Sequence, residues 1–437
     1  MAFIDDLAGL ALLPRNQLPE HELQLARYSL LDWVTCGVAG IGEPLAEKLR
    51  QLADREGGKP VASVFGGTRV PARMAALVNG ATSHALDYDD THFAHVGHLS
   101  VGIYPAALAA GEDQAASVEE VVEAFLVGAE VAIRVGVVLG SAHYNLGFHQ
   151  TATAGAFGAT AAAGRLYGLD KEQMRTALSL CATRASGLKS QFGTMGKPYN
   201  AGIAAANGVE CAQLAGLGFT SADDGLMGVQ GFVETHTPQP DPEAGWVTPP
   251  PETFLFRDNK YKLHACCHGL HAMIEALSEV REAETLALSD IEALHLRTAP
   301  RWLRVCNNPA PRTGLEAKFS YKWLAGMTLR GDQTGSDRTY TDEICTDTEL
   351  AAFAGKVTVE GDDSLTDAQA EGALTLVDGR SLTIRHDLDA PIPEEVLAGK
   401  LRAKAEAVLG PRGIAIWNRL DQLDGMAAQA LGDSLSE

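Results

Sequence analysis

The sequence has little positive charge and no long apolar run. Its 437 residues include 35 lysines and arginines against 56 aspartates and glutamates, a net charge of −21. Nucleic acids and anionic membrane surfaces bind basic faces, so neither is expected as a partner. No stretch approaches the ~18 apolar residues of a membrane span. Asp5 and Asp6 stand where a signal peptide would carry positive charge, which predicts a cytoplasmic protein.

Cysteine is also scarce. The seven cysteines are scattered along the sequence and form no C-x-x-C pair. Disulfide frameworks and zinc ribbons need regular cysteine spacing, whereas isolated cysteines in odd number are typical of reduced thiols. The apolar fraction of 46% is that of a globular protein. A chain of this length exceeds one ordinary core, so we expect two domains.

Helical periodicity dominates the chain from about residue 18 to residue 235. Capping boxes that begin at Ser117 and Asp170 precede apolar helical runs. Residues 151–164, TATAGAFGATAAAG, are almost all small, which favours a helix packed on every side. Residues 235–251 are rich in proline and are expected to be irregular.

Strand patterns follow in the second half. Residues 291–299 and 356–361 alternate like short, half-buried strands. Residues 373–387 are expected to form a hairpin around Asp378 and Gly379, a pair typical of a type I′ turn.

Helical patterns return at residues 394–410 and 417–431. We therefore predict a mainly α fold in which a large all-helical domain is followed by a smaller α+β domain and a C-terminal helical return. The predicted bounds are residues 1–258, 259–392 and 393–437.

Histidine is concentrated in three short stretches that hold nine of the thirteen histidines. These are His84, His92, His95 and His98, then His143 and His149, then His264, His268 and His271. A chance distribution would be more even. The clustering predicts one site assembled from distant segments.

Three interpretations of the first stretch, ALDYDDTHFAHVGHLS, compete. His92, His95 and His98 have the spacing H-x-x-H-x-x-H and could bind a metal with help from Asp89 and Asp90, as in a metal-dependent hydrolase. A solvated polar loop is the second interpretation, although apolar helix on both sides argues against it. The third is acid–base catalysis, in which a histidine moves a proton and an aspartate holds its tautomer.

Two lysines stand where they could bind a carboxylate and stabilise charge that develops on it. Lys197 interrupts an otherwise uncharged stretch, residues 191–207, and Lys262 precedes the third group of histidines. A non-enzymatic scaffold gives no reason for histidines and lysines clustered in this way.

The segment HALDYDDTHFAHVGHLSVGIYPAALAAGE resembles the signature of the MmgE/PrpD family, which contains 2-methylcitrate dehydratase, cis-aconitate decarboxylase and iminodisuccinate epimerase. Four further segments follow in the family's order: FHQTATAGAFGATAAAG, TMGKPYNAG, KLHACCHGLHAMIEAL and EAKFSYKWLAG. The resemblance implies that the α+β domain is a lid, that the active site lies between lid and helical domain, and that the protein is a homodimer. It implies no metal and no other cofactor.

The resemblance also implies roles for individual residues. The pattern of cis-aconitate decarboxylase, carried over to the matching positions, makes five residues catalytic: Asp87, His98, His149, Lys197 and Lys262.

The remaining matched positions are expected to bind substrate. Thr91 and the aromatic Tyr321 follow the family pattern. One extra residue before His98 leaves His95 as a rival for the catalytic position, and we place it beside the substrate. His264 stands where the family has an aromatic residue, and His-Leu-Ser replaces the family's usual His-Pro-Ser, so the substrate is left open.

The chemistry that the family shares is proton transfer at a carbon next to a carboxylate. We expect a lyase or isomerase of a small di- or tricarboxylate, with dehydration as the favoured outcome. The alternatives are epimerisation of a dicarboxylate such as iminodisuccinate and decarboxylation of the cis-aconitate type. The alternative from a different class is the metal-dependent hydrolase described above.

Overall fold

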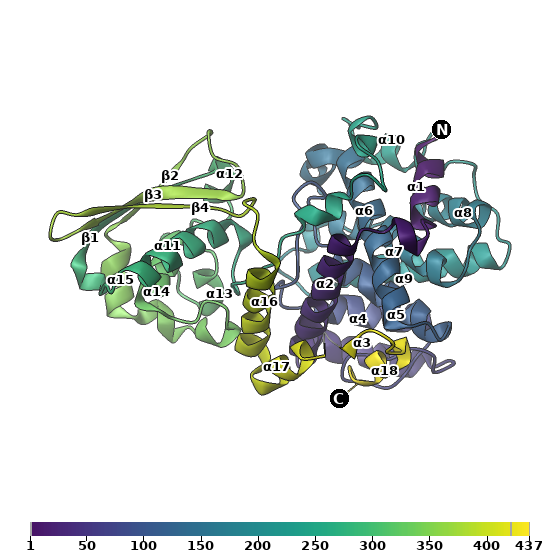
Figure 1. The fold of residues 1–437 in the computed structure, drawn as a ribbon, viewed down its shortest axis with the longest axis horizontal. Coiled ribbons are helices and arrows are strands. Elements are labelled where there is room, and N and C mark those ends of the chain that lie inside the picture. The colour runs from purple at the N-terminus through teal and green to yellow at the C-terminus, as the bar shows by residue number, and fades with distance from the viewer. Residues whose placement is uncertain (1, 420–421, 437) are drawn as a thin grey trace. The chain divides into compact units, whose positions relative to one another are not determined.

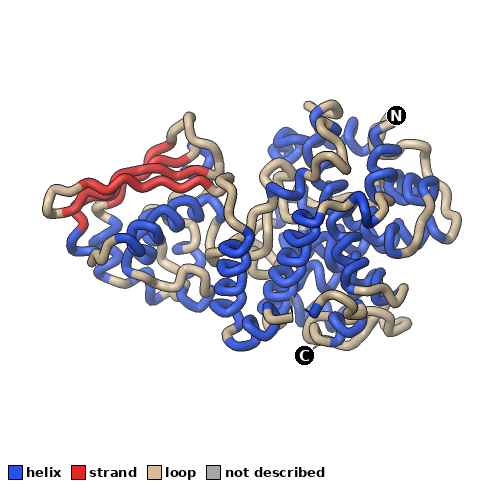
Figure 2. Tube along the Cα trace, viewed as in Figure 1, coloured by secondary structure: helices blue, strands red, loops and turns tan. Residues whose placement is uncertain are grey.

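The computed structural model describes residues 2–419 and 422–436, and the fold is mainly helical with one small sheet (Figures 1 and 2). The chain divides into two compact units. The first contains the residues up to Tyr261 and those from Ile414 onward, and the second is Lys262–Gly413. The sequence prediction placed its domain boundaries after residues 258 and 392.

The first unit is helical throughout. Its α-helices are α1 (Phe3–Ala11), α2 (Glu20–Gly40), α3 (Pro44–Glu56), α4 (Ala72–Ser83), α5 (Ser100–Asp113), α6 (Val118–Leu146), α7 (Gln150–Leu166), α8 (Lys171–Cys181), α9 (Gly196–Gly216), α10 (Phe232–His236) and α18 (Ala428–Asp433), while α17 (Pro411–Trp417) spans the junction. No helix in the described ranges has the length and apolar character needed to cross a membrane.

Helix α7 is the centre of this unit, as its small residues predict. Every residue from Gln150 to Gly164 is buried, and α5, α6 and α9 all pack against the helix. A Cβ on Gly158 would lie 2.5 Å from the backbone oxygen of Gly128 in α6. The two helices can approach this closely only because both positions are glycine.

Both capping boxes are confirmed. The Ser117 side chain accepts a hydrogen bond from the backbone N–H of Glu120 at the start of α6. The Asp170 side chain accepts one from the backbone N–H of Gln173 at the start of α8. The proline-rich stretch begins at the end of α10 and otherwise holds only the short 3₁₀ turn Ala244–Trp246, as expected.

The second unit contains the sheet, whose strand order is β2-β1-β3-β4. Strand β1 pairs with β2 in parallel and with β3 antiparallel, and β3 pairs with β4 antiparallel. Figure 1 shows α11 and α14 on one face of the sheet. The bounds are α11 (His271–Ala283), β1 (Ile291–Thr298), α12 (Pro300–Leu303), α13 (Gly314–Ala317), α14 (Tyr321–Arg330), α15 (Thr348–Ala354), β2 (Val357–Gly361), β3 (Gln369–Leu376), β4 (Ser381–Asp387) and α16 (Glu394–Leu409).

The strands confirm the sequence pattern, but the predicted turn type is wrong. Leu376 and Arg380 close a three-residue loop in which Gly379 alone has positive φ, at +87°. A type I′ turn needs positive φ at both central residues, and Asp378 does not have it. The loop is therefore a three-residue hairpin loop that ends in a left-handed glycine.

The C-terminal part also departs from the prediction. Helix α16 forms as expected but belongs to the second unit, with Leu401 and Ala405 buried. The helix expected over residues 417–431 does not form as one piece, since α17 ends at Trp417 and α18 begins at Ala428. Gly425, at φ +75°, lies between them in a conformation that no helix continues through.

Candidate active site

The motif from His84 to Ser100 forms the loop between α4 and α5. His84 is the first residue beyond α4, and Asp87 adopts the left-handed region at φ +52°. Two backbone hydrogen bonds between His92 and Gly97, of 2.8 and 3.4 Å, close the middle of the loop. Non-glycine residues rarely adopt positive φ outside functional or strongly constrained positions.

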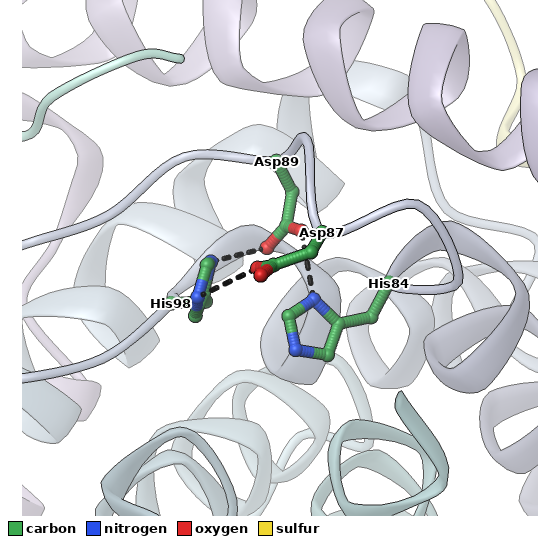
Figure 3. A group of neighbouring side chains, drawn as sticks. All are labelled: His84, Asp87, Asp89 and His98. Carbon is green, nitrogen blue, oxygen red and sulfur yellow. Dashed lines mark hydrogen bonds and ion pairs between the residues drawn. The ribbon is translucent and has the colours of Figure 1, made fainter. Parts of the chain in front are cut away.

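Asp89 holds two histidines at once (Figure 3). The Nδ1 of His84 lies 2.7 Å from one carboxylate oxygen, and the Nδ1 of His98 lies 2.8 Å from the other. The contact to His98 is bent, so it is an ion pair by distance and not a well-aligned hydrogen bond. Burial alone would raise the pKa of Asp89, but the two histidines hold it well below its usual range. Asp89 is therefore a buried, ionised carboxylate.

Asp87 connects His98 to a lysine from another helix. One oxygen of Asp87 lies 3.4 Å from the Nε2 of His98, and the other lies 2.6 Å from the Nζ of Lys197. Lys197 is in the first turn of α9, and its ammonium lies 5.3 Å from the centre of the Phe192 ring. His98 thus has a carboxylate at each ring nitrogen, and one of them carries a cationic partner.

His149 completes the cluster from the start of α7. Its Nδ1 lies 3.2 Å from the side-chain amide nitrogen of Asn200 on α9, and its ring stacks on His84 with centres 6.1 Å apart. Burial lowers the pKa of His149 well below 6.5, and the nearby His84 and Lys197 lower it further. His149 is therefore neutral at physiological pH.

Three helices begin at this cluster, namely α5, α7 and α9. The backbone N–H of His98 donates to the Thr151 hydroxyl at 3.0 Å, which ties the start of α5 to the start of α7. A Cβ on Gly97 would lie 2.8 Å from the Thr151 nitrogen, so only glycine permits this approach. Helix N-termini carry partial positive charge, and together with Lys197 they favour an anion at the cluster.

The histidine trio that the alternative metal interpretation requires is not assembled. The Nε2 of His92 lies 2.9 Å from the Leu255 carbonyl, and the Nδ1 of His95 lies 3.1 Å from the Ala132 carbonyl, so the two rings face different acceptors. His95 packs against α6 at Gly136. Of the two candidate histidines, it is His98 that contacts Asp87 and Asp89.

A different set of four residues has metal-ligand spacing in the described part of the chain: His84, Asp87, Asp89 and His98 offer ligand atoms within 4.8 Å of one another. These atoms already have partners, because Asp89 binds both histidines and Asp87 binds the Lys197 ammonium. A divalent ion would compete with these contacts and add positive charge beside that ammonium. The donor set suits a proton-transfer network better than a metal.

Of the other predicted site residues, Thr91 is in the loop between α4 and α5, and three are in the second unit. Thr91 pairs through its backbone with Lys260, at 2.7 and 2.8 Å. Lys262, His264 and Tyr321 belong to the second unit. Lys262 is buried there.

His264 and Tyr321 are each held by hydrogen bonds within that unit. The Nδ1 of His264 lies 2.8 Å from the Thr334 hydroxyl. Tyr321, the first residue of α14, donates its hydroxyl to the Gly269 carbonyl at 2.6 Å.

Three contributors to the cluster were missed in the sequence. His84 was counted among the clustered histidines but given no role, and Asp89 was considered only as a metal ligand. Asn200 carried a usable signal, because it follows Lys197 by three residues on a helix and so shares its face.

Comparison with known proteins gives matches along most of the chain. The model of the MmgE/PrpD N-terminal domain matches residues 10–245, and that of the MmgE/PrpD C-terminal domain matches residues 264–419. A cis-aconitate decarboxylase-like protein of Aspergillus oryzae, oryM, is 30% identical over 62% of this chain and 59% of its own length.

Two cis-aconitate decarboxylases match over more of the chain. That of Aspergillus terreus is 29% identical over 74% of this chain and 70% of its own length. The human enzyme is 26% identical over 93% of this chain and 87% of its own length.

Proposed function

The chain belongs to the MmgE/PrpD family, and we propose that it is a lyase that removes a proton from a carbon next to a carboxylate of a small di- or tricarboxylate. The observation that carries this proposal is the position of His98 between two carboxylates, one buried and one bound to Lys197. A histidine can take up a proton in the transition state, and the imidazolium that forms here would have a carboxylate on each side.

The main barrier to such a reaction is the negative charge that develops when the C–H bond breaks. That charge moves onto the neighbouring carboxylate of the substrate. Lys197 and the N-termini of α5, α7 and α9 offer positive charge at the cluster, in a chain whose net charge is −21. Groups fixed in place before the reaction stabilise such charge more effectively than water does.

Dehydration is the outcome we propose. The proton from carbon goes to His98, the electron pair forms the carbon–carbon double bond, and the hydroxyl leaves as water with a proton from a cationic donor. Lys197 is the donor nearest to His98, because both contact the same Asp87 carboxylate. The cluster thus holds both a base and an acid, which dehydration requires.

Decarboxylation is the second candidate, and the names of the relatives favour it. The Aspergillus terreus and human proteins are cis-aconitate decarboxylases. In that reaction the carbon–carboxylate bond breaks, carbon dioxide leaves, and the electron pair takes a proton at carbon. The same acid–base residues serve both reactions.

The proposal assigns the remaining predicted features as follows. The substrate and its negatively charged carboxylates are bound by Lys262, Thr91, His264 and Tyr321. The reaction uses no metal or other cofactor. The proposal also includes a homodimer in the cytoplasm, and sedimentation of the purified chain measures the oligomeric state.

The test is proton exchange in D₂O, followed by NMR with a panel of carboxylates that includes 2-methylcitrate, citrate, cis-aconitate and iminodisuccinate. At least one of these should exchange the proton next to a carboxylate, and His98→Gln should slow the exchange by ~10²-fold or more. Loss of water, loss of carbon dioxide or inversion without loss then separates dehydratase, decarboxylase and epimerase. A folded protein that exchanges none of them contradicts the proposal.

A further inference from the structure

The two histidines of the cluster have different kinds of partner at Nδ1. At His98 the partner is Asp89, whose carboxylate oxygen lies 2.8 Å away. At His149 the partner is Asn200, whose amide nitrogen lies 3.2 Å away. An ionised carboxylate only accepts hydrogen bonds, whereas an amide NH₂ only donates them. The partner of His98 therefore favours a proton on Nδ1, whereas the partner of His149 favours an Nδ1 without a proton.

The carboxylate of Asp89 requires a proton on the Nδ1 of His98. The contact is bent, but a bare ring nitrogen at 2.8 Å would set its lone pair against an ionised oxygen. The other oxygen of Asp89 accepts from His84 at 2.7 Å, which fixes the carboxylate in place. The Nε2 of His98 lies farther from its carboxylate, at 3.4 Å from an oxygen of Asp87, and the charge of Asp87 is already paired with the Lys197 ammonium at 2.6 Å. In neutral His98 the Nε2 is then the unprotonated, basic nitrogen.

The orientation of the Asn200 amide is set by a second partner. The same Nδ2 atom lies 3.3 Å from the Leu188 carbonyl, which accepts hydrogen bonds only. A flipped amide would place two acceptors against each other there. The NH₂ group therefore faces both Leu188 and His149, and the Nδ1 of His149 must be unprotonated.

From these contacts we propose that Asp89 and Asn200 are positioning residues that hold His98 and His149 in opposite tautomers. His98 presents a basic Nε2, and His149 presents an Nε2–H that donates a hydrogen bond without giving up its proton. This inference rests on the proposed function for its catalytic meaning, but the tautomers themselves do not depend on turnover.

The division suits proton removal next to a carboxylate. The C–H proton passes to the Nε2 of His98, and its electron pair moves into the enediolate formed with the carboxylate. A neutral Nε2–H of His149 stabilises an oxygen of that enediolate. Burial, which lowers the pKa of His149, and the Asn200 donor both oppose a second proton on this ring.

The decisive experiment is NMR of the full chain labelled with ¹⁵N in its histidines, at neutral pH and without substrate. Protonated and bare ring nitrogens differ strongly in ¹⁵N shift, and the His98→Gln and His149→Gln variants assign the signals. We expect His98 to carry its proton on Nδ1 and His149 to carry its proton on Nε2. The same tautomer on both rings, or a second proton on either His98 or His149, overturns the inference.

A matched pair of variants separates positioning from packing. Asn200→Asp places an acceptor at His149 and should move its proton to Nδ1, with kcat lowered by ~10²–10³-fold as for loss of one transition-state donor. Asn207→Asp makes the same change further along α9, where the amide donates at 2.7 Å to the Arg184 carbonyl, and should leave the His149 tautomer unchanged. An unchanged tautomer in Asn200→Asp also overturns the inference. Wild-type tautomers as expected, with no proton exchange on any carboxylate, would instead count against the proposed function alone.

Discussion

The difference between His95 and His98 is a matter of which atoms their rings face. His98 lies between two carboxylates, whereas His95 is buried against a backbone carbonyl of α6. We expect His98→Ala to lower kcat by ~10²–10⁴-fold with a smaller effect on KM, because proton transfer acts in the transition state. Steady-state kinetics on the substrate found by proton exchange measures this.

The variant His95→Ala is the control for that measurement. Its ring has no carboxylate partner in the described structure, so its loss should mainly affect stability, which thermal unfolding reports. If His95→Ala abolishes turnover in a folded protein while His98→Ala is nearly silent, the catalytic histidine is His95.

The role proposed for Lys262 leads to a different kinetic result. A lysine that binds a carboxylate equally in the ground state and the transition state contributes uniform binding. Lys262→Met should therefore raise KM by ~10–100-fold, the range for a lost charge-assisted hydrogen bond, and leave kcat nearly unchanged. A fall in kcat with constant KM would instead assign Lys262 to the chemical step.

At the scale of single residues, the structure shows how the side chains predicted for the site are connected, and the sequence did not show these connections. Asp87, His98, His149 and Lys197 were predicted together. In the structure Asp87 contacts both His98 and Lys197, and His149 is near enough for the charges of the other three to affect its pKa. The bridging role of Asp89 was not predictable, because it depends on the left-handed backbone at Asp87 that turns the loop. No local pattern specifies such a turn at an aspartate.

At the scale of elements, the small residues of α7 make a testable prediction. Gly158→Ala should destabilise the fold by ~1–3 kcal/mol, because the added methyl lies 2.5 Å from a backbone oxygen of α6, which cannot move aside cheaply. Urea unfolding of the variant and the wild type gives the difference.

A second helical glycine provides the control. Gly9 lies inside α1, and a Cβ there meets nothing within 4 Å. Gly9→Ala should therefore stabilise the protein by up to ~1 kcal/mol through helix propensity. A stabilising effect of both substitutions would show that α6 and α7 are not in close contact.

The elements also show which local signals carry structural information. Capping boxes and strand alternation were confirmed, because each is satisfied by residues close in sequence. The hairpin turn and the break between α17 and α18 were missed, because each depends on the backbone angles of one or two residues near a glycine. Asp378-Gly379 fits two turn types, and the pairing of the strands decides between them.

At the scale of the whole molecule, the fold should lose stability in acid through its buried histidines. Burial lowers the pKa of His143 to about 4 and that of His95 to about 3. In the unfolded chain both pKa values are ~6.5. Below that pH the unfolded chain binds protons that the native fold does not, so the free energy of unfolding falls with pH. The stabilisation is complete above pH ~6.5 and is lost progressively towards the folded pKa values.

A comparison of wild type with His143→Gln isolates one of these histidines. Glutamine can still donate to the His236 carbonyl, which the Nδ1 of His143 contacts at 2.7 Å. Carboxyl groups that titrate in the same range, such as Glu112, whose pKa burial raises to about 7, are present in both proteins and cancel in the difference. Between about pH 7.5 and about pH 5.0 the wild type should lose ~2 kcal/mol more than the variant in urea unfolding. Equal losses would mean that His143 takes up its proton without leaving the native fold.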